Sequence, residues 1–460
     1  MEKNATIIGV CAAIGTNGEG IVRSEDMTIF VPFLLLGEKA EIRILKTKGN
    51  IAYGKISELL TPAEERVRPV CPVFTKCGGC QLQHENYRAQ LKFKTELVKN
   101  SLEKIGGVKV SILPCIPSDK SYAYRNKLQM PIGKVGGENA VGFYAERSHR
   151  IVKTDVCPIH PKWAENVIRE TYRFMQTCGL DGYDEQTGEG QLRHIVVREL
   201  QGKFVVTLVS TVREIRGIDY FVHLLGNIFA EFSLYLNINA DQTNVIFGKE
   251  FILVAGSGFY ECEEAGIIFE AGAQTFVQVN EGIRGKLYAQ AVEKAEFGET
   301  VIDCYAGGGL LTAMFAKKCG RAYGIEIVPE ASRCADKIKE RNGLHEQMTN
   351  ICGDVAQELT KVLEQERGAT IVLDPPRGGV ERGVLQLLAK SDVKKIIMIS
   401  CNPATLARDL GILTGMLKEE NGELKKSDGA EGKFEVVSVQ PFDMFPQTKH
   451  VETLVVLNKK

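Results

Sequence analysis

Apolar residues recur in two different rhythms along this chain of 460 residues. Residues 1–62 carry short runs rich in Val, Ile and Phe, such as "GIVRSEDMTIFVPFLLLG". Turns that contain glycine separate these runs. This pattern predicts a five-stranded β-barrel, a fold that often binds oligonucleotides. From residue 281 onward, continuous apolar runs such as "TVIDC" alternate with amphipathic stretches such as "PEASRCADKIKERNG". Strands and helices that alternate in this way predict a doubly wound α/β domain with a parallel sheet.

The region between these two patterns is mixed. It contains a cysteine-rich stretch at 71–80 and an amphipathic stretch at 85–106, which predicts a helix ended by two glycines. Residues 119–153 carry seven Lys and Arg against three Asp and Glu, interleaved with aromatic residues. That mixture suits either a single-stranded nucleic acid or an ordinary solvated sheet surface. We therefore predict three domains: a barrel at 1–62, a central α+β domain at 63–272 and an α/β domain at 273–460.

Composition places the chain among soluble globular proteins, with 44% hydrophobic and 25% charged residues. No apolar run approaches the ~20 residues that span a bilayer, and the N-terminus lacks the basic segment of an export signal. A cytoplasmic location is therefore expected, where 13 cysteines indicate metal binding, catalysis or burial rather than disulfides. With a net charge of −1, any surface for nucleic acid must be local. The polar, glycine-rich residues 418–433 are interpreted as a solvated excursion.

Candidate cofactor chemistry lies at the ends of predicted strands, where open α/β sheets bind their ligands. The turn at 307–309 is all glycine, so a ligand can approach its backbone closely. Glu326 ends the next strand, 19 residues after Gly307, and an acidic residue at that offset accepts hydrogen bonds from ribose hydroxyls. The turn lacks the G-x-G-x-x-G pattern of dinucleotide sites, which favours S-adenosylmethionine over NAD. Asp374, in "LDPPRGG", stands at the tip of a third strand.

A cysteine and a glutamate complete the candidate chemistry. Cys401, in "ISCNPATLARD", is either a small buried hydrophobe or a nucleophile. Pro403 marks the start of a helix just beyond it, and the dipole of that helix is expected to lower the pKa of the thiol. Glu452, in "HVETLVVL", is either an exposed edge residue or a carboxylate whose pKa is raised by its apolar strand.

Residues 274–460 resemble the catalytic domain of the RNA uracil-5 methyltransferases, and the N-terminal piece resembles the TRAM domain of that family. The resemblance rests on "FVQVN", "DCYAGGG", "GIE", "DPPRGG", "SCNPATLARD" and "DMFPQTKHVE", which occur in the family's order. It implies a Rossmann-like class I methyltransferase domain that transfers a methyl group from S-adenosylmethionine to C5 of a uridine in RNA.

The resemblance also implies a role for each candidate residue. Uracil C5 is too poor a nucleophile to accept a methyl group until a thiolate adds to C6, and a base must later remove the C5 proton. Cys401 matches the nucleophile of the family and Glu452 matches its base. The residues implied to bind the cofactor are Gln278, Tyr305, Glu326, Asp354 and Asp374.

Four cysteines have the spacing of metal ligands. Cys71, Cys77 and Cys80 form a C-x5-C-x2-C motif, and Cys157 follows in "DVCPIHP". Zinc is one interpretation, although structural zinc sites more often use two close pairs. Three clustered thiolates and one distant thiolate suit an iron–sulfur cluster, and the resemblance implies the same arrangement. We therefore expect a [4Fe–4S] cluster.

The expected partner is RNA, with no membrane, and the protein is expected to be a monomer. The barrel and the cysteine motif favour 23S ribosomal RNA within the family. The alternatives are the T-loop uridine of tRNA and a non-catalytic iron–sulfur protein that only binds RNA. Other base methyltransferases fit less well, because Arg377 follows the Asp-Pro-Pro where an adenine-N6 enzyme would carry an aromatic residue.

Overall fold

The computed structural model describes residues 2–24, 26–420, 422–427, 429 and 432–460. Its N-terminal part is a closed barrel with the strand order β1-β2-β3-β5-β4, as predicted. Alternate apolar side chains fill the inside, among them Val22, Ile29 and Ile42, because successive strand residues point to opposite faces. The strands are β1 (Thr6–Ile14), β2 (Gly20–Ser24), β3 (Met27–Val31), β4 (Lys39–Lys48) and β5 (Ile51–Thr61).

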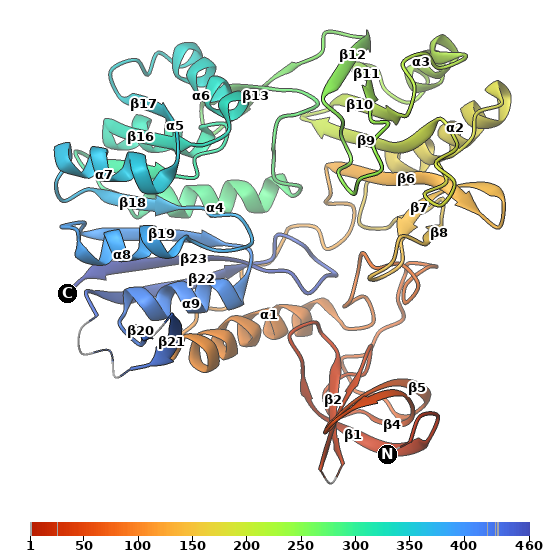
Figure 1. The fold of residues 1–460 in the computed structure, drawn as a ribbon, viewed down its shortest axis with the longest axis horizontal. Helices are drawn as coiled ribbons and strands as arrows, with labels where there is room; N and C mark the ends of the chain where they lie inside the picture. Colours follow the sequence, from red (N-terminus) through yellow and green to blue (C-terminus); the bar gives the residue numbers. More distant parts are fainter. Residues whose placement is uncertain (1, 25, 421, 428, 430–431) are drawn as a thin grey trace.

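The central part is a seven-stranded sheet with the order β12-β11-β10-β9-β6-β7-β8. Two helices, α2 (Trp163–Cys178) and α3 (Ile218–Gly226), pack on it around a core that includes Phe174 and Phe221. Figure 1 shows this sheet in yellow and green, opposite the C-terminal sheet in blue. The strands are β6 (Lys127–Val135), β7 (Glu138–Tyr144), β8 (Ile151–Lys153), β9 (Leu192–Leu200), β10 (Lys203–Ser210), β11 (Phe232–Ile238) and β12 (Glu250–Ala255).

The C-terminal sheet has the order β17-β16-β15-β18-β19-β23-β22. Strands β17, β16, β15, β18 and β19 are parallel, whereas β23 is antiparallel to both of its neighbours. The sheet departs from the predicted parallel arrangement only at β23, because β22 and β23 are joined by a hairpin loop and not by a crossover helix. The strands are β15 (Thr300–Cys304), β16 (Arg321–Glu326), β17 (Met348–Cys352), β18 (Thr370–Leu373), β19 (Lys395–Ser400), β22 (Phe434–Phe442) and β23 (Glu452–Lys459).

Helices cover both faces of this sheet, and each face has its own apolar core. One core includes residues of α7 (Val355–Gln365), α8 (Arg382–Lys390) and α9 (Pro403–Leu413). The other includes residues of α4 (Glu281–Glu293), α5 (Leu310–Cys319) and α6 (Pro329–Arg341), with the hairpin of β13 (Tyr260–Glu264) and β14 (Ile267–Ala271) packed beside them. The doubly wound α/β class is confirmed.

The predicted helix before residue 106 forms and lies against the C-terminal sheet. It consists of α1 (Tyr87–Ser101) and a π-helical turn η1 (Leu102–Gly106). Val98 and Leu102 are fully buried in the same core as Leu410 of α9, and Figure 1 shows α1 (orange) beside α9 and β22. A helix from the N-terminal half of the chain thus completes a face of the C-terminal sheet.

The described residues of the predicted solvated excursion at 418–433 are mostly exposed and include a hairpin. Strands β20 (Leu417–Glu420) and β21 (Glu423–Lys426) form an antiparallel hairpin there, while residues 421, 428 and 430–431 lie outside the described residues. Within the part of the chain that the structure describes, no helix is both long and apolar enough to cross a membrane.

Candidate active site

The C-terminal sheet brings Cys401 and Glu452 to the same edge. Cys401 follows the last residue of β19, and Glu452 is the first residue of β23. These strands are antiparallel, with Ser400 opposite Thr453. Extending this register by one residue brings Cys401 next to Glu452. Asp374 follows β18, the parallel neighbour of β19, and reaches the same edge. Three residues from distant parts of the sequence therefore converge.

The turn that carries Cys401 is fixed by its neighbour Asn402. The Asn402 side chain accepts a hydrogen bond from the Ala404 N–H (3.1 Å) and caps α9, and Pro403 occupies the first helical position. The same side chain donates to the Arg377 carbonyl (3.1 Å), which ties this turn to the segment after Asp374. The segments "DPPRGG" and "SCNP" are therefore held together by this hydrogen bond.

Burial and charge both act on Glu452. Its exposed fraction is 3%, and burial raises its pKa well above the ordinary range, with a further contribution from the Asp374 carboxylate. The Arg377 guanidinium opposes this shift of the Glu452 pKa. Burial also raises the pKa of Asp374 to about 7. The raised pKa expected for a glutamate in an apolar strand is therefore found.

The pKa of Cys401 differs from the prediction. It is raised, first by burial and then by the charges of Glu452 and Asp374, although Arg377 lowers it. The expectation that the helix N-terminus would lower the thiol pKa is wrong, because burial, and then two nearby carboxylates, oppose a thiolate. Arg377 is the charge that favours the thiolate, and the sequence analysis used this residue only to exclude adenine chemistry.

The second half of the edge surrounds the glycine turn after β15. The Glu326 carboxylate accepts hydrogen bonds from the Gly307 N–H (2.9 Å) and the Val328 N–H (2.8 Å). A carboxylate has about four lone-pair sites, so further donors can still be accepted. Gly307 has φ +54° and no atom within 4 Å of the position where a Cβ would stand. The backbone therefore faces open space beside an acidic group, which fits a cofactor with hydroxyl groups.

Asp303 is a residue that the sequence analysis did not single out. It is almost fully buried near the end of β15 and accepts a hydrogen bond from the Thr312 hydroxyl (2.6 Å). Burial raises its pKa to about 7, and the charges of Asp374 and Glu326 contribute, so it lies between the two halves of the site. An aspartate inside an apolar strand just before a glycine turn was the available signal.

The remaining predicted cofactor residues lie on three different loops. Tyr305 follows β15 with φ +66°, a conformation that is uncommon outside glycine and concentrates at functional sites. Asp354 caps α7 by accepting from the Gln357 N–H (3.2 Å), so part of its side chain serves the helix. Gln278 lies in the loop before α4, where its carbonyl accepts from the Asn126 side chain (3.1 Å). Their contacts with a cofactor stay predictions.

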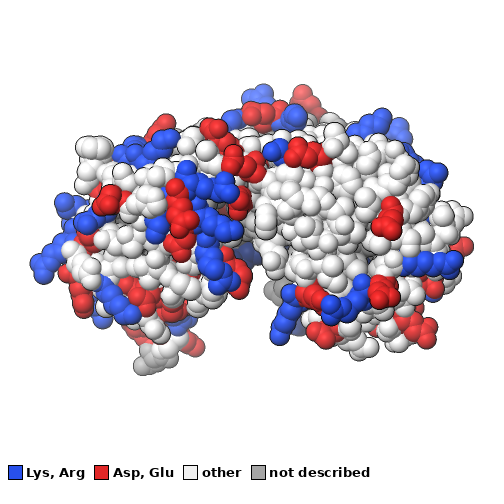
Figure 2. Space-filling model, turned by 90° about the horizontal axis from the view of Figure 1, so that it is seen from above, with Lys and Arg blue, Asp and Glu red and all other residues white. Residues whose placement is uncertain are grey.

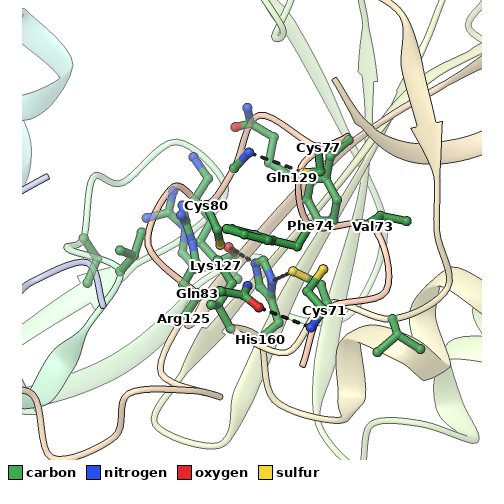
Figure 3. Close-up of a pocket in the computed structure, with 18 of the residues that line it drawn as sticks. Cys71, Val73, Phe74, Cys77, Cys80, Gln83, Arg125, Lys127, Gln129 and His160 are labelled. Carbon is green, nitrogen blue, oxygen red and sulfur yellow. Dashed lines mark hydrogen bonds between the residues drawn. The ribbon is translucent and has the colours of Figure 1, made fainter. Parts of the chain in front are cut away.

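The four cysteines of the predicted metal motif line one cavity of about 260 Å³ between the segment after the barrel and the central sheet (Figure 3). Cys71 donates its N–H to the Gln83 side chain (3.2 Å), and burial raises the pKa of Cys80 to about 12. The cavity also contains His160, whose Nδ1 lies 3.2 Å from the Cys157 sulfur. The sequence analysis missed His160, although "CPIH" places it three residues after Cys157.

The four cysteines of the motif are not arranged as the ligand set of a single metal ion. Among the described residues, no three His, Cys, Asp or Glu side chains are close enough to ligate a single metal ion. A zinc ion with bonds of ~2.3 Å would hold its sulfurs roughly 3.8 Å apart. The cavity is therefore not a preformed zinc site.

The basic stretch at 119–153 contributes only part of its aromatic residues to the surface. Tyr124 is buried and donates its hydroxyl to the Pro446 carbonyl (3.1 Å), so it is not available to stack on a base. Figure 2 shows Lys and Arg side chains along one border of the hollow between two lobes, within a surface of mixed charge. Positive charge is thus local, as the net charge requires.

The fold defines the class of protein. A solved structure of a Pyrococcus abyssi tRNA (uracil-54, C5)-methyltransferase, in complex with S-adenosyl-L-homocysteine, matches 98% of this chain and 100% of that chain. The TM-score is 0.74 and the sequence identity is 24%, which establishes a shared fold. The two proteins share the architecture described above, an α/β domain with a central sheet domain and an N-terminal barrel.

Sequence comparisons then define the family. The family model described as tRNA (Uracil-5-)-methyltransferase matches residues 198–460. A protein of Clostridium tetani, named an RNA methyltransferase, is 36% identical over 99% of this chain and 97% of its own length. A Listeria innocua protein with the same kind of name is 34% identical over 100% of this chain and 99% of its own length. The chain belongs to the RNA uracil-5 methyltransferase family and is an RNA methyltransferase.

Proposed function

We propose that this enzyme methylates C5 of a specific uridine in RNA through a covalent adduct between Cys401 and C6 of the base. One observation carries the proposal: the paired strands β19 and β23 bring a cysteine and a buried glutamate with a raised pKa to one edge. A thiol and a carboxyl group that takes up protons readily are the two groups that this chemistry requires.

Each side chain has a distinct task in the proposed reaction. The Cys401 sulfur forms a bond to C6, which makes C5 carbanion-like while Arg377 offsets the negative charge of the thiolate. After C5 has gained its methyl group, Glu452 removes the C5 proton. The electron pair of that C–H bond then reforms the C5–C6 double bond, and the Cys401 thiolate leaves. The target base must leave its stack to reach the sulfur.

The methyl donor of this family is S-adenosylmethionine, which supplies a methyl group activated by a sulfonium centre. Glu326 would hold its ribose hydroxyls, because its carboxylate stands beside the open backbone of Gly307. Gln278, Tyr305, Asp354 and Asp374 would complete the pocket. The buried Asp303 carboxylate accepts a hydrogen bond from Thr312 of α5, which ties the strand before the glycine turn to the helix after it.

A [4Fe–4S] cluster is the second part of the proposal. What supports it is that the four cysteines of the motif line one cavity, and that three clustered thiolates with one distant thiolate suit an iron–sulfur cluster. Cys71, Cys77, Cys80 and Cys157 would hold the cluster, whose chemistry would be structural. Its ligands come from the segment after the barrel and from the loop after β8, so it would fasten these two regions together.

The barrel offers a surface for RNA. Phe30 of β3 and Tyr53 of β5 are paired in register and their rings stack with centroids 5.8 Å apart. Tyr53 is 46% exposed, and its partner in β4 is Lys46. Exposed aromatic rings beside a cation are typical of surfaces that bind single-stranded nucleic acid.

We infer that the target lies in 23S ribosomal RNA, on the strength of the cysteine motif. The presence of the barrel does not decide between ribosomal RNA and tRNA as the target, since the match to the Pyrococcus abyssi tRNA methyltransferase covers 98% of this chain. That match makes the T-loop uridine of tRNA the second candidate.

The test compares RNA from a strain that lacks this enzyme with RNA from its parent. We expect 5-methyluridine to disappear from 23S ribosomal RNA, and the purified enzyme to restore it from labelled S-adenosylmethionine. Restoration in tRNA alone would assign the second candidate. No transfer to any RNA would indicate a protein that only binds RNA.

A further inference from the structure

The loop at 443–451 connects β22 to β23 and ends directly at Glu452. Phe442 and Glu452 are the last residue pair of this hairpin, so the course of the loop decides how Glu452 enters the sheet. Figure 1 shows the loop extending from the sheet toward the central part of the molecule. A displaced loop would therefore displace the first residue of β23.

A buried ion pair holds the start of this loop. Lys94 of α1 contacts the carboxylate of Asp443, and both side chains are fully buried. The Lys94 ammonium also donates to the Phe445 carbonyl (3.0 Å). A lysine with no exposure to solvent is rare, and it needs compensation for its lost hydration.

Two buried amides hold the middle of the loop. Gln90, one helical turn before Lys94, donates to the Gln447 side-chain oxygen (3.0 Å) and accepts from the Gln447 N–H (3.0 Å). Gln447 has φ +70°, which a non-glycine residue adopts only where its surroundings enforce it. The backbone carbonyl of Gln447 accepts from the N–H groups of Gln81 (3.1 Å) and Leu82 (3.0 Å).

Other segments of the chain hold the same loop. Tyr124 donates to the Pro446 carbonyl (3.1 Å), and the Lys449 ammonium donates to the Asn17 side chain in the barrel (2.5 Å). Residues 446–449 and Asp443 are thus contacted from four segments: the barrel, the segment after Cys80, α1 and the segment that contains Tyr124. This number of independent contacts specifies one position for the loop.

Stability alone does not explain the ion pair. Replacing a buried ion pair by apolar residues of similar volume is often neutral or stabilising, whereas a pair of charges has one preferred geometry. We propose that Lys94 and Asp443 are positioning residues for catalysis: they fix the loop so that Glu452 stands in reach of the C5 proton. This inference rests on the role of Glu452 in the proposed function.

The test uses the full-length protein with both charges replaced, Lys94→Met together with Asp443→Leu. We expect the double variant to melt close to the wild type and to keep its Kd for RNA and for S-adenosylmethionine. Its kcat should fall on the order of 10²-fold, the usual effect of a catalytic group displaced by about 1 Å. Because proton removal is the affected step, the covalent enzyme–RNA adduct should accumulate on a denaturing gel.

A control removes a different ion pair, one that is partly buried. Arg66 and Glu38 join the barrel to the following segment, with exposed fractions of 22% and 0%, and they do not contact the loop. Arg66→Met together with Glu38→Leu should leave kcat unchanged at saturating RNA, with no adduct. Accumulation of adduct in this control as well would overturn the inference, since loss of any buried pair would then suffice.

Two further outcomes separate this inference from the proposed function. A Lys94→Met/Asp443→Leu enzyme with wild-type kcat overturns the positioning role while the proposed function stands. If wild-type protein forms no 5-methyluridine in any RNA, the proposed function fails and the inference falls with it. Should the double variant not fold, Gln90→Ala leaves both charges in place, and the same loss of kcat with accumulated adduct is expected.

Discussion

The thiol of Cys401 and the carboxyl groups of Glu452 and Asp374 titrate as a group. Each carboxylate charge raises the pKa of the thiol, and burial raises the pKa of each carboxyl group. When Glu452 is protonated, its charge no longer opposes the thiolate. In the proposed reaction, a protonated carboxyl group would therefore assist the attack of Cys401, and the same group would have to lose its proton before acting as the base.

Two substitutions separate the roles of these residues. Cys401→Ala should bind RNA and form no covalent adduct, because no group can add to C6. Glu452→Gln keeps the thiol, so addition and methylation proceed and the methylated adduct accumulates, while turnover falls on the order of 10²–10⁴-fold as a base is lost. A denaturing gel with labelled RNA and labelled cofactor shows a shifted band only for Glu452→Gln. Wild-type turnover by Glu452→Gln would assign the base to another group.

The ends of β15 and β16 act together as one element of the site. Glu326, the last residue of β16, holds the turn after β15 through the Gly307 N–H and the start of α6 through the Val328 N–H. This arrangement presents two strand ends to one ligand, as is general for open α/β sheets. The position of the carboxylate is therefore set before a ligand binds.

Loss of this carboxylate should weaken binding of S-adenosylmethionine. Glu326→Ala removes the acceptor for the ribose hydroxyls, and we expect a loss of roughly 1.5–3 kcal/mol, the usual value of hydrogen bonds to a charged group. Titration calorimetry measures it, with Glu330→Ala as the control, because Glu330 is exposed on α6 and pairs with Arg333 on its own helix. Equal affinity in wild type and Glu326→Ala would contradict the assignment.

At the scale of the whole molecule, the cysteine cavity joins parts of the chain that have no shared sheet. The segment after the barrel supplies Cys71, Cys77 and Cys80, and the loop before α2 supplies Cys157. Residues directly after Cys80 also bind the loop before Glu452. The cavity therefore lies at the junction of the barrel, the central sheet and the C-terminal sheet.

Metal analysis tests this junction. Protein purified without oxygen should be brown and contain about four iron and four sulfide per chain. Cys80→Ser should lose most of the iron, whereas Cys352→Ser should keep it, because Cys352 is exposed at the end of β17 and far from the motif in sequence. One equivalent of zinc without iron, under strict exclusion of oxygen, would refute the cluster.

The sequence by itself determined the classes of element and the chemistry at the strand ends. Periodicity of apolar residues specifies the barrel and the α/β domain, since the periods of strand and helix differ. Gly307, Glu326 and Asp374 are predicted from short local patterns, whereas the roles of Cys401 and Glu452 are predicted from the family resemblance.

Only the tertiary structure decided how those residues act on each other. The antiparallel position of β23, which brings Glu452 to the edge where Cys401 lies, depends on pairing between distant segments. Burial of the thiol, together with the charges of Glu452 and Asp374, raises the pKa that the sequence predicts to be lowered. The same holds for Lys94, whose helical pattern gives no sign of a partner 349 residues away. Local patterns fix backbone conformation, whereas pKa values and buried ion pairs depend on which surfaces meet when the chain folds.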